Sequence, residues 1–184
     1  MDSDSSVLMP AQLLVDHWRL FEKERLGGPI LDLACGDGHN GIFLATKDLP
    51  VICCDISEHA LSRAERMASE NRVKVGLWQR DLETEAENPL PADFFGGILV
   101  FRYLHRPLIP CIKKAFKKGG ILIYETFTID QPKFGKPHNP DFLLEPGELL
   151  GWFKDWGIVY DFEGVKQGPE RAVAQVVCRK PNKT

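Results

Sequence analysis

The stretch Ile30-Leu-Asp-Leu-Ala-Cys-Gly-Asp-Gly-His-Asn-Gly41 decides the fold of this chain. Its first half is a short apolar run, typical of a buried strand, that contains one acid, Asp32. Its second half contains the pattern Gly36-x-Gly38-x-x-Gly41 and is followed by a helix-like segment. Glycines at a strand-to-helix turn let the backbone come close to a ligand, because no Cβ stands in the way. The stretch therefore predicts a turn that binds a nucleotide-type cofactor.

The position of Asp32 indicates which kind of cofactor this is. A dinucleotide such as NAD brings a pyrophosphate to such a turn, and a carboxylate four residues before the first glycine would repel it. A cofactor with a sulfonium and an amino group would be attracted instead. A charge inside an apolar strand is costly unless it is paired. We therefore expect Asp32 to face the cofactor, and the alternative is a helix-capping or solvent-facing acid.

The pattern hydrophobic-x-Asp-x-x-Cys-Gly-x-Gly resembles the first motif of class I S-adenosylmethionine-dependent methyltransferases. A lone G-x-G-x-x-G is weak evidence, but further elements of this family follow in order over residues 30–179. They are Val51-Ile-Cys-Cys-Asp55, Trp78-Gln-Arg-Asp81-Leu82, Gly97-Ile-Leu-Val-Phe-Arg-Tyr-Leu104 and Lys118-Gly-Gly-Ile-Leu-Ile-Tyr-Glu125. Asn40 and Arg102-Tyr-Leu-His-Arg-Pro107 are most similar to the small tellurite-resistance-type methyltransferases.

The resemblance implies S-adenosyl-L-methionine as the cofactor and S-adenosyl-L-homocysteine as the product. Asp32 would accept a hydrogen bond from the methionyl amine, directly or through water. Asp55 ends the second strand, where a carboxylate binds both ribose hydroxyls. Its alternative role is a helix N-cap, which Ser57 already supplies. Asp81 would lie near the adenine amino group, or be an ordinary loop acid. The other cofactor-binding candidates are Ala34, Gly36, Gly38, Asn40, Ile56, Leu82, Phe101 and Arg102.

The substrate-side candidates follow the fourth and fifth strands, because ligands bind at the carboxyl ends of the strands in such folds. They are Arg102, Tyr103, His105, Glu125 and His138. Glu125 and His105 are candidate general bases, although neither is an obvious one. A methyl group on a charged sulfur is already activated, so holding the nucleophile in line supplies most of the acceleration. Thiols, selenols and reduced tellurium species need little or no base, which favours a small, soft or easily ionised acceptor.

The long irregular segment at residues 128–145 is a candidate substrate lid. We expect Phe134 or Phe142 to exclude water there, with Lys133, Lys136 or His138 facing the acceptor. A proline-stiffened connector is the alternative. The basic residues in the segments after strands four and five favour an anionic acceptor if they converge, and are solvated surface charges if they do not. They are Arg102, His105, Arg106, Lys133, Lys136 and His138.

Alternating strands and helices predict an α/β fold, a Rossmann-like three-layer sandwich. Its sheet would be seven-stranded and mostly parallel, with a C-terminal antiparallel hairpin. We expect one domain over residues 1–184, with an N-terminal helical segment at 1–28 whose helix spans 10–25. A helix at 108–117 would be closed by Gly119-Gly120. The expected strands are residues 30–34, 51–54, 74–79, 97–101, 121–127, 157–162 and 172–179.

The charge, the hydropathy and the cysteine spacing of the chain disfavour several classes of function. The net charge of −3 and the pI of about 6.0 provide no field that attracts nucleic acid or anionic membrane. No apolar run has the length of a membrane span, and the polar, acidic start is no secretory signal. The five cysteines match no zinc or redox spacing, so we expect reduced thiols, a cytoplasmic protein and no metal. Two other functions stay open, namely an inactive S-adenosylmethionine- or nucleotide-binding module and an NAD-dependent oxidoreductase. Asp32 argues against the oxidoreductase. The sequence does not predict the oligomeric state.

Overall fold

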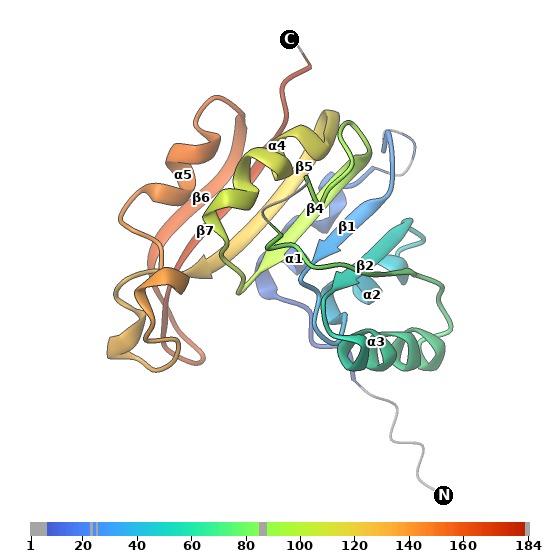
Figure 1. Cartoon of the computed structure of the whole chain (residues 1–184), viewed down its shortest axis with the longest axis horizontal. Helices are drawn as coiled ribbons and strands as arrows, with labels where there is room; N and C mark the ends of the chain where they lie inside the picture. Colours follow the sequence, from blue (N-terminus) through green and yellow to red (C-terminus); the bar gives the residue numbers. More distant parts are fainter. Residues whose placement is uncertain (1–6, 23, 25, 85–87, 183–184) are drawn as a thin grey trace, which may run out of the picture.

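The computed structural model describes residues 7–22, 24, 26–84 and 88–182, which surround a seven-stranded sheet (Figure 1). The strand order is β3-β2-β1-β4-β5-β7-β6. The strands are β1 (Ile30–Leu33), β2 (Val51–Asp55), β3 (Gly76–Gln79), β4 (Phe95–Phe101), β5 (Phe116–Phe127), β6 (Gly157–Lys166) and β7 (Arg171–Arg179). Strand β7 runs antiparallel to both of its neighbours, whereas the pairs from β3 to β5 are parallel. This confirms the predicted mostly parallel sheet with a C-terminal antiparallel hairpin.

Helices cover both faces of the sheet and complete the predicted three-layer sandwich (Figure 1). They are α1 (Gln12–His17), α2 (His39–Ala45), α3 (Glu58–Glu70), α4 (Ile109–Ala115) and α5 (Glu148–Phe153). Successive residues of a strand point to opposite faces, so β4 sends Leu99 toward α1, α2 and α3. It sends Ile98 and Val100 toward α4 and α5. Both faces of the central strands are therefore buried, which explains their continuous apolar sequences.

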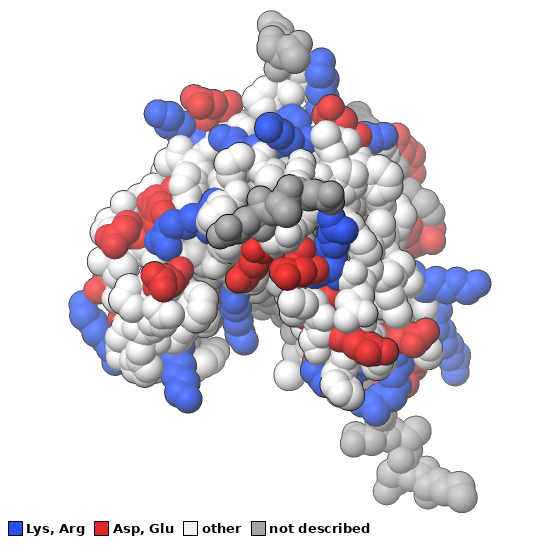
Figure 2. Space-filling model, in the orientation of Figure 1, with Lys and Arg blue, Asp and Glu red and all other residues white. Residues whose placement is uncertain are grey.

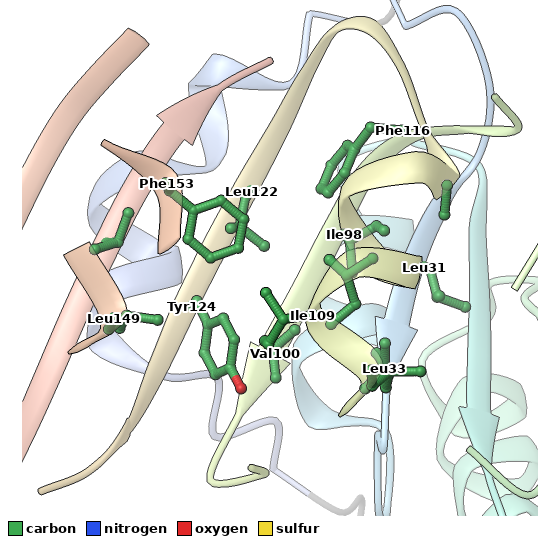
Figure 3. Packing of buried hydrophobic residues seen from close by; sticks show 14 of the residues in the cluster. Leu31, Leu33, Ile98, Val100, Ile109, Phe116, Leu122, Tyr124, Leu149 and Phe153 are labelled. Carbon is green, nitrogen blue, oxygen red and sulfur yellow. The ribbon is translucent and has the colours of Figure 1, made fainter. Parts of the chain in front are cut away.

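The apolar side chains on the face of the sheet under α4 and α5 hold the ends of β4 and β5 in place. Figure 3 shows Phe153 and Leu149 from α5 packed toward Leu122 and Tyr124 of β5. Burial of each large apolar side chain stabilises the fold by about 1.5–3 kcal/mol. The Tyr124 hydroxyl donates to the Tyr103 carbonyl at 3.0 Å. The core thus holds the segment that follows β4 in a defined position.

The N-terminal helix is shorter than the predicted 10–25. The α-helix ends at His17, and one 3-10 turn, Trp18–Leu20, follows it. Phe21 then leaves the helical conformation, with φ −84° and ψ 80°, and its side chain is buried in the core. Burial of this ring outweighs continuation of the helical pattern. Residue 25, the predicted end, lies outside the described residues.

The second difference concerns Gly119-Gly120, which do not close a helix. Helix α4 ends at Ala115, and β5 begins at Phe116, which pairs with Phe95 of β4. Phe116 is fully buried, with its ring 5.2 Å from that of Trp156 in an edge-to-face arrangement. Gly119 instead lies within β5 with φ +76°, a conformation that favours glycine. The aromatic burial decides where the strand begins. Strand β6 also extends beyond its predicted end, to Lys166.

Candidate active site

The turn after β1 uses its glycines for different purposes. Gly36 and Gly38 have φ +54° and +81°, as the motif predicts for a tight turn. A Cβ on Gly38 would lie 2.9 Å from the Cβ of Ala64 in α3, so this glycine permits close packing inside the protein. A Cβ on Gly36 would meet nothing within 4 Å. Gly36 is therefore the glycine with open space in front of it, where a ligand would approach.

Asp32 lies beneath this turn. Its side chain is 2% exposed, and its Oδ2 accepts a hydrogen bond from the amide of Gly41, in the first turn of α2, at 2.8 Å. Burial raises the pKa of Asp32 to about 7, against the opposing effect of the Gly41 bond, and the nearby Asp55 charge raises it further. In this structure Asp32 thus has the helix-capping contact that the sequence left open as the alternative.

Asp55 ties the turns after β1 and β2 together. Its Oδ2 accepts from Gly36 N and its Oδ1 from Ser57 N, both at 2.9 Å. Ser57 caps α3, since its hydroxyl accepts from Ala60 N at 3.2 Å. The N-cap role is therefore filled by Ser57, as expected, and the Asp55 carboxylate stands at the mouth of a cavity.

That cavity, which we call the β2-side cavity, has a volume of about 500 Å³. It brings together most of the residues predicted to bind an adenosyl group. Ile56 is 62% exposed, whereas Leu82 is buried. The cavity therefore has one apolar side chain that is open to solvent and one that is packed into the core. The lining residues are Ala34, Asp55, Ile56, Arg80, Asp81, Leu82, Glu83 and Tyr103.

A second hollow of about 560 Å³, the N-terminal cavity, continues from Ala34 along the turn. The predicted residues in it are Ala34, Gly36, Asn40, Phe101, Arg102 and Glu125. The sequence analysis missed residues 9–12, which cover it, Gly168 and Pro169 of the β6–β7 turn, and Arg171 at the start of β7. Asn40 Oδ1 accepts from Ala11 N at 2.8 Å, so this side chain fastens the N-terminal segment over the cavity.

Two strand ends at these cavities carry unusual backbones. Ala34 after β1 and Arg102 after β4 have φ +53° and +56°, the left-handed region that non-glycine residues rarely adopt. The amide of Arg102 donates to the carbonyl of Glu125 at 2.9 Å, which holds it in this conformation. Such strain persists where the surroundings impose it, and it is concentrated at ligand sites.

Glu125 is a fixed carboxylate rather than a free one. It is 5% exposed, and its Oε2 accepts a hydrogen bond from Gln175 Nε2. Its Oε1 lies 4.0 Å from Arg171 Nε. Two residues of the neighbouring strand β7 therefore stabilise its charge, which makes Glu125 less suited to the base role that the sequence suggested.

A third hollow of about 410 Å³ lies under the 128–145 segment, and we call it the lid cavity. Its lining residues are Glu83, Arg102, Tyr103, Leu104, Phe127, Lys136, Pro137 and Phe142. Of the predicted lid residues, Phe142 and Lys136 thus face it. Lys133 instead pairs with Asp130 at 2.5 Å. His138 is exposed, and Phe134 is half-buried outside this lining.

The 128–145 segment is fastened to the body of the protein. Its ends meet in a short bridge, where Ile129 N donates to Leu144 O at 3.0 Å and Leu144 N to Phe127 O at 2.9 Å. Arg106 forms two bonds to the Glu148 carboxylate, at 2.7 and 2.8 Å, and Nη2 also donates to Leu143 O at 2.9 Å. Arg106 therefore holds the segment in place, and its guanidinium is engaged within the protein.

Arg106 and Glu148 shift each other's ionisation. The hydrogen bond to Glu148 raises the pKa of Arg106, and the same bond lowers the pKa of Glu148 below its ordinary value. Both groups are charged at neutral pH, so the clasp is an ion pair with bidentate geometry.

His105 is separated from the other substrate-side candidates. It lines another hollow, of about 380 Å³, together with Thr84, Asn88 and Cys111. Tyr103, by contrast, lies between the β2-side and lid cavities and lines both. Its hydroxyl donates to Glu83 Oε1 at 3.3 Å, and burial with the nearby acid raises the pKa of Tyr103.

The three cavities lie next to one another at the carboxyl edge of the parallel strands, and we call them together the trough. Ala34 joins the first two, and Arg102 joins the second to the lid cavity. Figure 2 shows the molecule hollowed between the lid side and α3, with acidic and basic side chains around the hollow. A larger cavity of about 790 Å³ lies at the opposite edge, beside Pro29 and Pro50 before β1 and β2. It contains none of the predicted site residues.

Comparison with known proteins agrees with the fold and the motifs. Residues 30–120 match a family described as methyltransferase domain. The probable S-adenosyl-L-methionine-dependent methyltransferase TehB of Haemophilus influenzae is 29% identical over 134 residues, covering 69% of this chain and 45% of that protein. The chain thus spans less than half the length of this curated relative.

Solved structures support the same arrangement. The crystal structure of TehB from Haemophilus influenzae has a TM-score of 0.75 at 20% identity, covering 92% of this chain and 62% of that one. The tRNA (uracil-54, C5)-methyltransferase of Pyrococcus abyssi, in complex with S-adenosyl-L-homocysteine, has a TM-score of 0.59 at 21% identity. The match covers 91% of this chain and 37% of that one.

The fold and the glycine turn define a class in which a cofactor lies across the carboxyl ends of β1, β2 and β4. Residues 30–120 match the domain of this class, the class I S-adenosyl-L-methionine-dependent methyltransferases, and the chain is similar to the TehB type. The cofactor of the class is S-adenosyl-L-methionine, and S-adenosyl-L-homocysteine is its product. No helix within the described residues is long and apolar enough to cross a membrane.

Proposed function

We propose that this chain transfers the methyl group of S-adenosyl-L-methionine to a small-molecule acceptor bound beneath residues 128–145. The adjacency of the three cavities carries the proposal. Arg102 lines both the N-terminal and lid cavities, and Tyr103 lines both the β2-side and lid cavities. A cofactor along the first two cavities would therefore meet an acceptor in the third.

The proposed cofactor contacts follow from this placement. The ribose hydroxyls would donate to Asp55, and adenine would lie between Ile56 and Leu82 with its amino group toward Asp81. The methionyl part would lie in the N-terminal cavity beside Gly36 and Phe101. Asp32 is buried below the turn, so we propose that its charge stabilises the cofactor amine through the turn rather than by direct contact.

The chemistry requires little from the protein beyond placement. A lone pair on the acceptor forms the new bond to the methyl carbon, while the electron pair of the carbon–sulfur bond stays on sulfur. The sulfonium becomes a neutral thioether, and a thiolate-type acceptor arrives without a proton to remove. Orientation and removal of water can then supply most of the acceleration. Phe142, Pro137 and Phe127 are the apolar side chains placed to exclude water from the lid cavity.

Two observations favour a small acceptor over RNA, the substrate of the Pyrococcus abyssi relative. The net charge of −3 gives no general attraction to phosphates. The 128–145 segment is fastened over the lid cavity by Arg106, which narrows the approach. We propose that this segment is a lid and not a connector lying away from the site.

The test is formation of S-adenosyl-L-homocysteine when the protein is incubated with S-adenosyl-L-methionine and a panel of thiols, carboxylates and chalcogen oxyanions. We expect product with at least one acceptor, and calorimetric binding of NAD(H) at least tenfold weaker than that of S-adenosyl-L-homocysteine. Equal or tighter NAD(H) binding contradicts the cofactor placement. Tight S-adenosyl-L-homocysteine binding without turnover on any acceptor favours the inactive binding module.

A further inference from the structure

The lid cavity combines an apolar wall with two cations and one acid, Glu83, whose Oε1 accepts a hydrogen bond from the Tyr103 hydroxyl. Leu104 and Phe127 form the side toward the sheet, and Pro137 and Phe142 form the side toward the 128–145 segment. Arg102 and Lys136 also line it. Its volume of about 410 Å³ lies within the range of pockets that enclose organic ligands. A small inorganic oxyanion would leave most of this apolar surface in contact with water.

The cations around the 128–145 segment differ in their partners. Arg106 pairs with Glu148, and Lys133 pairs with Asp130. Neither of these paired cations lines the lid cavity. Arg102 and Lys136, which do line it, have no acidic partner within 4.0 Å among residues 7–22, 24, 26–84 and 88–182. Both cations that line the lid cavity are thus without an acidic partner among the described residues.

The position of Arg102 is imposed by the backbone. Its left-handed conformation, φ +56°, is held by the bond from its amide to Glu125 O. This conformation starts the segment that leads into the lid cavity, and it places the residue at the boundary with the N-terminal cavity. A cation at this boundary lies beside the place where acceptor and cofactor would meet.

We propose that the acceptor is an organic anion, with a flat apolar body against Phe127, Pro137 and Phe142 and a carboxylate between Arg102 and Lys136. This inference rests on the proposed function, because it names the occupant of the same trough. Charge-assisted hydrogen bonds orient the carboxylate, and the apolar wall supplies affinity. A bare oxyanion of selenium or tellurium makes only the first kind of contact, so it is a poorer substrate than the organic anion.

The experiment compares acceptors that differ in one property. 4-Mercaptobenzoate has the apolar body, the anion and a soft nucleophile, 4-mercaptobenzamide lacks the anion, and tellurite lacks the apolar body. We expect the ratio kcat/KM for the benzoate to exceed that for the benzamide by about tenfold, the effect of one charge-assisted contact. Tellurite should be methylated less efficiently than either thiol.

Two lysines of the 128–145 segment provide a matched pair of variants. Lys136→Gln should raise KM for 4-mercaptobenzoate about tenfold, without changing KM for the benzamide or the affinity for S-adenosyl-L-homocysteine. Lys133→Gln removes the same charge from a paired, exposed position and should change none of these. Equal use of benzoate and benzamide, preference for tellurite, or equal effects of the two variants would overturn the inference.

A binding measurement separates this inference from the proposed function. The affinity of each thiol is measured by calorimetry on the protein saturated with S-adenosyl-L-homocysteine, where no turnover is needed. Preferential binding of the benzoate that is lost in Lys136→Gln supports the inference even if no methyl is transferred. Equal affinity for both thiols contradicts it even if the protein is an active methyltransferase.

Discussion

The two sides of the trough, on either side of β4, are held together in different ways. On the β1–β2 side, carboxylates accept hydrogen bonds from backbone amides, as Asp55 does from Gly36 and Ser57 and Asp32 from Gly41. On the β5 side, side chains far apart in sequence meet each other, as Arg106 does with Glu148 and Gln175 with Glu125. The first arrangement shapes a turn, whereas the second fastens one segment over another.

This difference suggests a division of labour. A turn built from backbone amides has little freedom, which suits a cofactor that every acceptor must share. Side-chain contacts across long loops are easier to change, and they suit the recognition of one acceptor. We therefore predict that substitutions on the β1–β2 side act on cofactor binding and fold stability, and that those on the β5 side act on binding of the acceptor.

The largest effect should come from Asp32. Its pKa is raised in the folded protein, so its stabilising contribution is fully present below pH 4 and is lost as the pH rises through about 7. A rise from 3.8 to about 7 corresponds to about 4 kcal/mol. Chemical denaturation of the cofactor-free protein should show the free energy of unfolding falling, relative to Asp32→Asn, by up to about this amount across that range.

The amide oxygen of Asp32→Asn can still accept the Gly41 hydrogen bond, so the variant removes the titration and keeps the contact. Other carboxyl groups contribute to the pH dependence of both proteins and cancel in the difference. Parallel stability curves for the two proteins between pH 4 and pH 8 would show that Asp32 titrates normally and that the β1–β2 side carries no such strain.

Asp55 should give the next largest effect. Asp55→Ala removes the contacts to Gly36 N and Ser57 N and the proposed bonds to the ribose. Loss of charge-assisted bonds costs roughly 1.5–3 kcal/mol, so the affinity for S-adenosyl-L-homocysteine should fall about 10- to 150-fold by calorimetry. Asp37→Ala is the control, since Asp37 is an exposed acid of the same turn paired with Arg63. If the control loses as much affinity as Asp55→Ala, general loss of charge explains the result.

Arg106 should give a smaller effect, confined to the β5 side. Arg106→Gln breaks a partly exposed ion pair and two bonds to backbone carbonyls, which should cost about 1 kcal/mol. Limited proteolysis should then cleave residues 128–145 faster, and KM for the acceptor should rise about fivefold, while cofactor affinity stays unchanged. Weaker cofactor binding in this variant would contradict the division between the two sides.

The same clasp predicts a weak pH effect. The pKa of Glu148 is lowered in the folded protein, so its contribution is present above the ordinary carboxyl pKa and is lost as the pH falls through the lowered value. Proteolysis of residues 128–145 by an acid-active protease should therefore accelerate only at acid pH, and Glu148→Gln should remove this dependence. A clasp that opens near neutral pH would rule out Glu148 as the group responsible.

The contrast between the two sides of the trough also explains which features can be predicted from the sequence. The glycine turn and the mostly parallel sheet with its antiparallel hairpin rest on a short motif and on alternating elements, and the structure agrees with both. The helix closure at Gly119-Gly120 was predicted wrongly, because the burial of Phe116 decides where the strand begins. The pairing of Arg106 with Glu148 was not predicted, because Glu148 lies far along the chain. The N-terminal cover and Arg171 were missed for the same reason, since no local pattern connects them to the turn.

A crystal structure with S-adenosyl-L-homocysteine tests the division of the trough most directly. The account predicts adenosine in the β2-side cavity, with both ribose hydroxyls within hydrogen-bond distance of Asp55. It also predicts the sulfur at the boundary marked by Arg102 and Tyr103, facing the lid cavity. An adenosine bound in the lid cavity would contradict the account. So would a sulfur more than about 10 Å, roughly one Debye length, from every residue of 133–142.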